Sequence, residues 1–265
     1  MSGFSIKDNY NINDLLEIMR ILRSENGCPW DKVQTHKSIR CDFIEETYEA
    51  CEAIDKEDTE LLREELGDVL LQVVFHSQIE NEVGSFTFDD VANDVCKKLI
   101  VRHPHVFSDV IANTPEEVLK NWDKIKKETK GQETYTDTLK SIPDVFPALM
   151  KAQKIGKRAS RAGMDFENED TAFKALCSEV DELKEALNDK SNSDHLKEEI
   201  GDVIFSAVNV ARKLGFDAEE LLNASSKKFV DRFEKTENLL RSDGIDMKSL
   251  DIDELDVYFN RAKMI

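Results

Sequence analysis

Two stretches of the chain, a little over 130 residues apart, carry the same arrangement of acidic residues. Each reads ExxE, then a gap of about fifteen residues, then EExGD. Residues three positions apart project from one face of a helix, and a reversal of the chain within the motif can bring two such faces together. The acidic residues are Glu46, Glu49, Glu64, Glu65 and Asp68 in the first copy and Glu179, Glu182, Glu198, Glu199 and Asp202 in the second.

Several converging carboxylates repel one another unless cations neutralise them. Oxygen ligands without Cys or His suit Mg²⁺ or Mn²⁺ rather than zinc. The ordinary alternative is a solvated acidic face, because the chain has 55 acidic residues. The motif occurs twice, however, and Asp68 and Asp202 each lead directly into a strongly apolar stretch, where a solvated charge has no reason to lie. The sequence therefore predicts a magnesium site in each half, with manganese as a possible substitute.

A glycine precedes the aspartate in both copies, Gly67 in the first and Gly201 in the second. A glycine inside a helix costs about 1 kcal/mol relative to alanine. That cost is tolerable where another backbone or a ligand approaches the helix closely. We expect such an approach at both glycines.

A Lys and an Arg four residues apart follow each acidic motif, as Lys98 with Arg102 and as Lys228 with Arg232. This spacing places both cations on one helix face, where they suit the oxygens of a phosphate chain. An ordinary surface pair is the alternative, but the recurrence favours a polyphosphate pocket. Several bound ions could orient such a substrate and acidify a water for phosphoanhydride hydrolysis. We assign the proton-accepting role to Glu198 or Glu199.

The composition and the apolar spacing predict an all-α protein. The 265 residues include only ten Gly and five Pro, and no strand alternation of useful length occurs. We expect a tandem repeat of four-helix units, with an N-terminal domain at 1–130, a linker at 131–147 rich in Gly, Thr, Ser, Asp and Pro, and a C-terminal domain at 148–265. The predicted helices begin near residue 15 and span about 38–54, 59–82, 87–102, 114–130, 148–160, 170–187, 194–214, 218–241 and 251–263.

The charge and the cysteines restrict the partners and the compartment. A net charge of -19 argues against a general nucleic-acid binder, because phosphate affinity needs clustered Lys and Arg. The five cysteines form no CxxC pair and suit a reduced, intracellular setting, where we expect them to be packing residues. No signal core and no spanning apolar run occurs, so we expect a soluble, cytoplasmic protein without a membrane partner.

Three further residues have structural interpretations. His103 and His105 lack Cys partners for a zinc site, and we expect them to cap the end of the fourth helix. Trp30, in a loop before the first acidic helix, is expected to be buried and to anchor that loop.

The ordered motifs resemble the MazG family of nucleoside triphosphate pyrophosphohydrolases over nearly the whole chain. Besides the acidic repeats they are NGCPWD at 26–31, RHPHVF at 102–107, KAQKIGKR at 151–158 and KFxxRF within 228–233. The resemblance implies an all-α fold and cleavage of ribo- and deoxyribonucleoside triphosphates between the α and β phosphates. The products would be a nucleoside monophosphate and pyrophosphate. It also implies magnesium dependence, a homodimer and a housecleaning role.

The resemblance also suggests which copy is active. In two-domain relatives the C-terminal repeat is taken as the main hydrolase, which would assign Lys228 and Arg232 to the phosphates. Relatives place a base-stacking aromatic residue near the end of the chain, and the matching region is Tyr258 and Phe259, for which packing on the fourth helix is the alternative. The N-terminal copy keeps every charged element. It remains open as a second hydrolase, a dimerisation scaffold or a regulatory nucleotide site.

Two other classes compete with a hydrolase. Ferritin-like di-iron proteins need ExxH on two helices, and the residue three after the glutamate here is never His. A catalytically weak helical nucleotide-binding or dimerisation protein is the remaining alternative. It would leave the recurrence of the glycine and of the basic pair unexplained.

Overall fold

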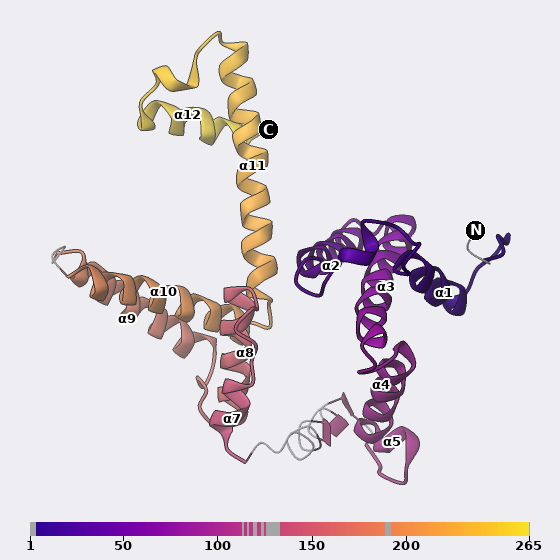
Figure 1. Cartoon of the computed structure of the whole chain (residues 1–265). Coiled ribbons are helices and arrows are strands. Elements are labelled where there is room, and N and C mark those ends of the chain that lie inside the picture. Colours follow the sequence, from indigo (N-terminus) through magenta and orange to yellow (C-terminus); the bar gives the residue numbers. More distant parts are fainter. Residues whose placement is uncertain are drawn as a thin grey trace. The chain divides into compact units, whose positions relative to one another are not determined.

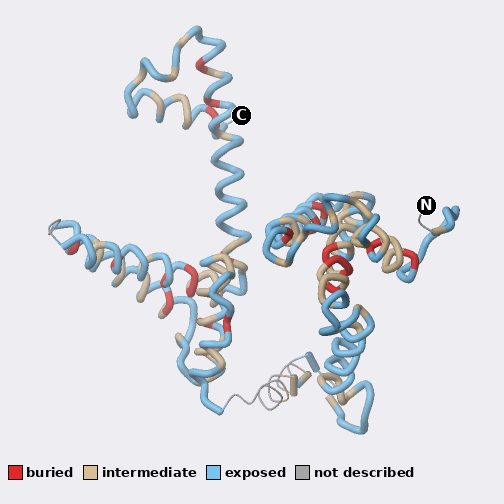
Figure 2. The backbone as a smooth tube through the Cα atoms, viewed as in Figure 1, coloured by how far each residue is buried: buried red, intermediate tan, exposed pale blue. Residues whose placement is uncertain are grey.

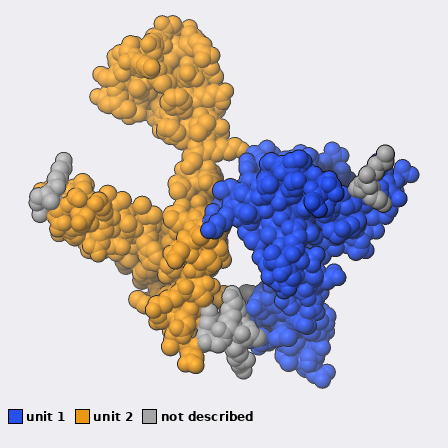
Figure 3. All heavy atoms as spheres, viewed as in Figure 1, with its two compact units in different colours: residues 1–126 blue, residues 127–265 orange. Residues whose placement is uncertain are grey.

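The computed structural model describes residues 4–112, 114–115, 117–118, 121–122, 125, 133–188 and 192–264. Within these ranges every regular element is helical and no strand occurs, so the predicted all-α class is confirmed (Figure 1). The chain divides into two compact units, residues 1–126 and 127–265, and each is described by itself (Figure 3). Of the predicted helix at 114–130, most residues lie outside the described ranges.

The helices of the first unit begin at the residues that the sequence marks as caps. Asn11, Asp58 and Thr87 each accept hydrogen bonds from the first turn of a helix through the side chain. The helix predicted at 59–82 is confirmed with these bounds. The unit consists of α1 (Ile12–Leu22), a 3₁₀ turn (Asp31–Val33), α2 (Arg40–Asp55), α3 (Thr59–Glu82), α4 (Phe88–Arg102) and α5 (Pro104–Phe107).

The core of the first unit lies where α1 crosses the C-terminal half of α3. Met19 from α1, Ile39 and the pair Val74 and Phe75 from α3 form one buried cluster. At its edge the Arg23 guanidinium lies over the Phe75 ring, 5.1 Å from the centroid. Trp30 is not part of this core. Its side chain is 57% exposed, so the prediction of a buried anchor is wrong, because the core closes on Ile39 instead.

The second unit repeats the acidic helix pair and adds a helix that the sequence did not indicate. The expected linker 131–147 contains α7 (Tyr135–Lys140), which begins at a capping box on Thr134. Arg158 donates hydrogen bonds to the Thr138 carbonyl and to Ser141 Oγ, and Ile142 is buried. The other elements are α8 (Ala148–Arg161), α9 (Glu169–Ala186), α10 (Ser193–Lys213), α11 (Ala218–Ser242), a 3₁₀ turn (Met247–Ser249) and α12 (Ile252–Ala262).

Helix α8 approaches α10 closely at Gly156. A Cβ atom at this position would lie 2.7 Å from Asn209 Oδ1 and 2.8 Å from Arg212 Nε, so a larger residue would displace these side chains. Arg212 in turn pairs with Asp165 at 2.5 Å, and Lys213 Nζ lies 3.3 Å from the same carboxylate. This charged group joins the loop after α8 to the end of α10.

We expect Asp165→Asn to lower the free energy of unfolding of the second unit by about 2 kcal/mol, because it leaves the Arg212 side chain largely buried without its counterion. The Arg212 guanidinium holds the pKa of Asp165 well below its usual range. The pair therefore contributes fully above the unfolded carboxyl pKa of about 4, and its contribution is lost as the pH falls below that value. Urea denaturation at several pH values measures the difference. The control is Asp144→Asn, at a carboxylate with a 93% exposed side chain; equal losses from both would contradict the prediction.

Helix α11 is held at its start and exposed along its middle. The Gln153 side chain accepts a hydrogen bond from the Ala218 backbone N–H (2.8 Å) and donates one to the Phe216 carbonyl (2.9 Å). Residues 220–231 are then exposed without interruption (Figure 2). Further along, α12 packs against α11. The exposed stretch includes Leu221, Leu222, Phe229 and Val230.

The cysteines are not packing residues in this structure. Cys41, Cys51, Cys96 and Cys177 are exposed and Cys28 is partly buried, so the prediction is wrong for four of the five. These four lie on helix faces that the described part of the same chain leaves uncovered. Among the described residues, no helix combines the length and apolarity needed to cross a bilayer.

Candidate metal centres

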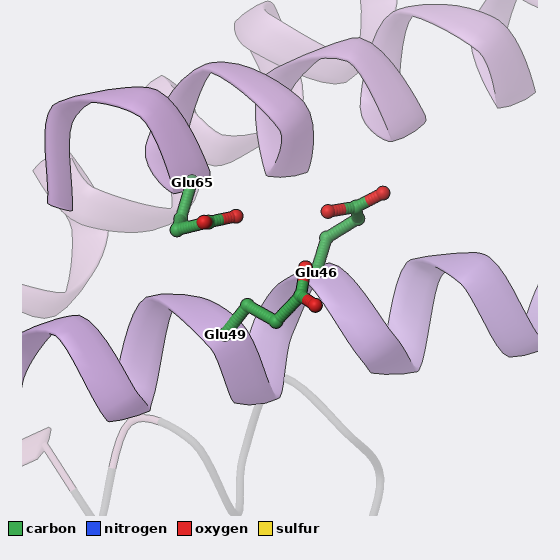
Figure 4. Close-up of side chains that lie close together, drawn as sticks. All are labelled: Glu46, Glu49 and Glu65. Atoms are coloured by element: carbon green, nitrogen blue, oxygen red, sulfur yellow. The ribbon is translucent and has the colours of Figure 1, made fainter. Parts of the chain in front are cut away.

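The first acidic motif forms a carboxylate cluster between α2 and α3. Glu46 and Glu49 project from α2, and Glu65 projects toward them from α3 (Figure 4). One carboxylate oxygen of each lies within 4.8 Å of the others. Oxygens at this separation can share one hard cation. We call this group the first cluster.

The second acidic motif forms the corresponding group between α9 and α10. Oxygens of Glu179, Glu199 and Asp202 lie within 4.8 Å of one another, and we call this group the second cluster. Glu199 is 7% exposed, and its Oε2 is buried without a hydrogen-bond partner in the described structure. Its Oε1 lies 3.3 Å from His195 Nδ1. The sequence analysis missed His195, although it lies four residues before Glu199 and so on the same helix face.

The structure does not bring all of the predicted carboxylates together. Glu64 and Glu198 are exposed outside the clusters, because each neighbours a cluster residue in sequence and points about 100° away around the helix. Glu182 is also outside, and its Oε1 accepts a hydrogen bond from Ser178 (3.1 Å). Asp68 lies close enough for its charge to act on Glu46 and Glu65. The metal-binding roles of these residues remain predictions.

Burial and the neighbouring negative charges both raise the pKa of a glutamate in each cluster. Burial raises the pKa of Glu46, and the charges of Asp68 and Glu49 raise it further. Burial also raises the pKa of Glu179, with further contributions from Glu182 and Asp202. We therefore expect a proton or a cation to stabilise each cluster.

We expect Glu179→Gln to raise the Tm of the metal-free protein by about 2 °C at pH 7. Because the pKa of Glu179 is raised in the folded state, the wild type loses stability as the pH rises from about 4.3 through that raised pKa. The glutamine does not titrate and avoids this loss. Thermal unfolding in EDTA measures the difference, and Mg²⁺ should reduce or reverse it by stabilising the wild type more. Glu185→Gln, at an exposed carboxylate of α9, is the control; an equal rise there would contradict the explanation.

Gly67 and Gly201 lie beside the clusters without a close neighbour. No atom outside the local helix comes within 4 Å of the position of an added Cβ at either glycine. The expected close approach of another part of this chain is therefore absent.

The predicted basic pairs lie on α4 and α11. Lys98 and Lys228 are exposed, and Arg102 and Arg232 are partly buried. Within the described residues of each unit, no ion pair or hydrogen bond joins the basic pair to the cluster of the same unit. A single chain thus presents the acidic groups and the predicted phosphate-binding groups without direct contact between them.

The two aromatic residues near the C-terminus are engaged in packing. The Phe259 ring lies 5.6 Å from the Phe229 ring of α11, with Lys263 Nζ 5.5 Å from its centroid. Tyr258 donates a hydrogen bond to Asp243 Oδ2 at 2.9 Å. In this conformation both side chains contact α11 or its C-terminal end. This is the alternative that the sequence analysis considered for them. Stacking of a base on either ring stays a prediction.

The expected capping role of His103 is confirmed. Its Nδ1 lies 2.7 Å from the Leu99 carbonyl oxygen in the last turn of α4. The ring also meets the Trp122 ring edge-on, with centroids 5.4 Å apart. These contacts assign His103 to the helix end and not to a zinc site.

Comparison with known proteins identifies the repeat. A family model described as the MazG nucleotide pyrophosphohydrolase domain matches the chain twice, over residues 34–107 and 167–236. Together the two matches cover more than half of the chain, and each contains one cluster. The chain belongs to the MazG family. The resemblance drawn from the motifs is therefore confirmed.

Several MazG relatives match almost the whole chain. A protein of Thermotoga maritima named nucleoside triphosphate pyrophosphohydrolase/pyrophosphatase MazG is 43% identical over 250 residues, which cover 94% of each chain. A nucleoside triphosphate pyrophosphohydrolase of Escherichia coli is 42% identical over 257 residues, covering 95% of this chain and 97% of the relative. YabN, an uncharacterized protein of Bacillus subtilis, is 42% identical over 246 residues, covering 93% of this chain and 50% of its own length.

Proposed function

We propose that this MazG protein hydrolyses ribo- and deoxyribonucleoside triphosphates at the α–β phosphoanhydride, giving a nucleoside monophosphate and pyrophosphate. The observation that carries the proposal is the convergence of three carboxylates in each repeat, where burial and then the neighbouring charges raise the pKa of Glu46 and of Glu179. The names of the relatives from Thermotoga maritima and Escherichia coli support this activity. We propose that the protein acts in the cytoplasm.

The second cluster fits a magnesium ion. Its ligand atoms would be carboxylate oxygens. The buried Glu199 Oε2 lacks a hydrogen-bond partner in the described structure, which is expected of an oxygen that binds a cation. Glu179, Glu199 and Asp202 would hold the ion, and Mn²⁺ could replace it. Bound Mg²⁺ would neutralise phosphate charge and lower the pKa of a water nucleophile.

The remaining roles follow from the positions of the side chains. We assign the proton-accepting role to Glu198 or Glu199: Glu199 lies in the second cluster as a ligand, whereas Glu198 lies outside it. Glu182 follows Glu179 by one helical turn, and its charge already acts on Glu179, so it is placed to approach a bound cation. Lys228 and Arg232 would bind the phosphates once α11 approaches the cluster.

A homodimer would provide that approach. The middle of α11 is largely exposed and carries Leu221, Leu222 and Val230, besides Phe229, whose ring contacts Phe259. Exposed apolar side chains grouped in this way are typical of an interaction surface. We propose that a second copy of the chain packs against this stretch. The α11 helix of one copy then brings Lys228 and Arg232 to the second cluster of the other, which completes the site.

Product analysis tests the proposed reaction. The full-length protein is incubated with ATP, GTP, dATP and dCTP in turn, and the products are separated by ion-exchange chromatography. We expect monophosphate and pyrophosphate from each substrate with Mg²⁺ and none with EDTA, because the carboxylates act through the cation. Diphosphate with orthophosphate would overturn the proposed bond specificity, and turnover in EDTA would overturn the metal requirement.

A further inference from the structure

The first unit contains a cavity that the proposed reaction at the second cluster does not use. It has a volume of about 450 Å³ and lies between α2, α3 and the start of α4. Phe43, Phe86 and Val91 supply apolar walls, and His36, His76 and Arg40 add polar groups. A largely apolar cavity of this size with a few polar groups suits a small ligand with an aromatic ring.

The cavity lies along the same helix pair as the first cluster. Phe43 precedes Glu46 by three residues on α2, so both share one helix face. On α3, His76 follows Asp68 by eight residues, a separation of about 12 Å along the helix axis. A ligand with a ring at one end and phosphates at the other could thus reach from the cavity to the first cluster.

A hydrogen-bonded chain orients the two histidines of the cavity. His36 Nε2 lies 2.6 Å from Glu80 Oε1, and His36 Nδ1 lies 2.7 Å from His76 Nδ1. The carboxylate accepts, so His36 Nε2 carries a proton, and one proton lies between the two Nδ1 atoms. Burial lowers the pKa of His76, with a further contribution from His36. His76 Nε2 takes no part in this chain and belongs to a ring that lines the cavity.

The second repeat does not reproduce this group, although it reproduces the carboxylates. When the two acidic motifs are superposed, Phe173 takes the place of Arg40, Val210 that of His76 and Leu214 that of Glu80. Phe173 and Leu214 are 55% and 51% exposed. These polar groups of the cavity are therefore specific to the first unit. The fold of the repeat does not require them, because the second unit forms the same helices without them.

We propose that this cavity binds the base and ribose of a nucleotide whose phosphates lie at the first cluster. The base stacks against Phe43 and His76, whose rings lie 5.6 Å apart, and a polar atom at the edge of the base forms a hydrogen bond with His76 Nε2. Arg40, exposed at the rim, meets the ribose or the first phosphate. The first unit is then a nucleotide site in its own right. This inference rests on the proposed cation site at the first cluster.

Calorimetry with two ligands separates the cavity from the cation site. The full-length protein carries Glu199→Gln and Asp202→Asn, so that the first cluster alone holds Mg²⁺. It is titrated with inorganic tripolyphosphate and with the α,β-methylene analogue of ATP. We expect the nucleotide to bind roughly tenfold more tightly than tripolyphosphate, because only the nucleotide fills the cavity.

Two variants in this background test the cavity directly. His76→Ala removes the ring and its hydrogen-bonding nitrogen, and Val91→Trp fills the cavity from a wall residue that is 36% exposed. Both should bring nucleotide affinity down to that of tripolyphosphate and leave tripolyphosphate binding unchanged. The control Val210→Ala, at the matching position of the second repeat, should change neither.

Each alternative result has a distinct meaning. If tripolyphosphate and nucleotide bind equally, or if both variants keep the nucleotide preference, the cavity proposal is overturned and the cation site stands. If neither ligand binds in the presence of Mg²⁺, the cation site at the first cluster fails and the cavity proposal fails with it.

Discussion

Glu199→Gln and Asp202→Asn should each reduce nucleoside triphosphate hydrolysis by about 100-fold or more, because each removes a charged ligand from the second cluster. Glu199 is the buried member of that cluster and has an unpaired oxygen, so its neutral amide would leave the cation without its best-placed ligand. Steady-state release of pyrophosphate measures the loss.

The first repeat supplies the matched control. Glu65→Gln and Asp68→Asn make the same changes at the equivalent positions and should reduce the rate only slightly. The second site has a neighbour that the first lacks: the equivalent of His195 in the first repeat is Leu61, which cannot contact the carboxylate through a ring nitrogen. A large loss from the first pair with retained activity in the second would move the catalytic site to the first cluster.

Two inactive variants should restore each other when they form mixed dimers. Glu199→Gln lacks a metal ligand, and Arg232→Ala lacks a phosphate contact. If the site combines α10 of one copy with α11 of the other, a mixed dimer contains one intact site out of two, so the purified mixed dimer should show roughly half of the wild-type rate. Co-expression with two different tags, followed by an assay of the doubly tagged species, makes the measurement.

The appropriate control mixes Glu199→Gln with Asp202→Asn. Both changes lie in the same half of the proposed site, so no arrangement of the two chains restores it, and the rate should stay low. If mixing with Arg232→Ala also restores nothing while doubly tagged dimers form, α11 serves the cluster of its own chain. The proposal of a site shared between copies would then be wrong.

The two repeats share their carboxylates and differ in the groups around them. The second cluster has a buried glutamate with a histidine beside it, and the first has a cavity with two histidines two helical turns away. This difference suits a division in which the second unit hydrolyses and the first recognises a nucleotide. The calorimetric titrations test nucleotide binding by the first unit, and the hydrolysis rates of the variants test catalysis by the second.

Local sequence was sufficient for the helices and for the acidic pattern. The caps Asn11, Asp58 and Thr87 and the apolar spacing act within a few residues, so the bounds of α3 could be predicted from the sequence. The same periodicity placed Glu46 and Glu49 on one face of α2. The repeat of these features also revealed the tandem organisation, because it requires only a comparison of the chain with itself.

Contacts between residues far apart in the sequence decided which glutamate is buried, where α7 lies and how the two histidines pair. The sequence could not distinguish Glu199 from Glu198, because only the packing of α9 on α10 buries one and exposes the other. Helix α7 is fixed within the expected linker by Arg158, twenty residues from Thr138. The pairing of His36 with His76 across 40 residues likewise depends on how α3 lies against the loop before α2. Periodicity and capping arise from neighbours along one helix, whereas burial, proton position and cavity shape arise from the packing of helices that the sequence pattern does not orient.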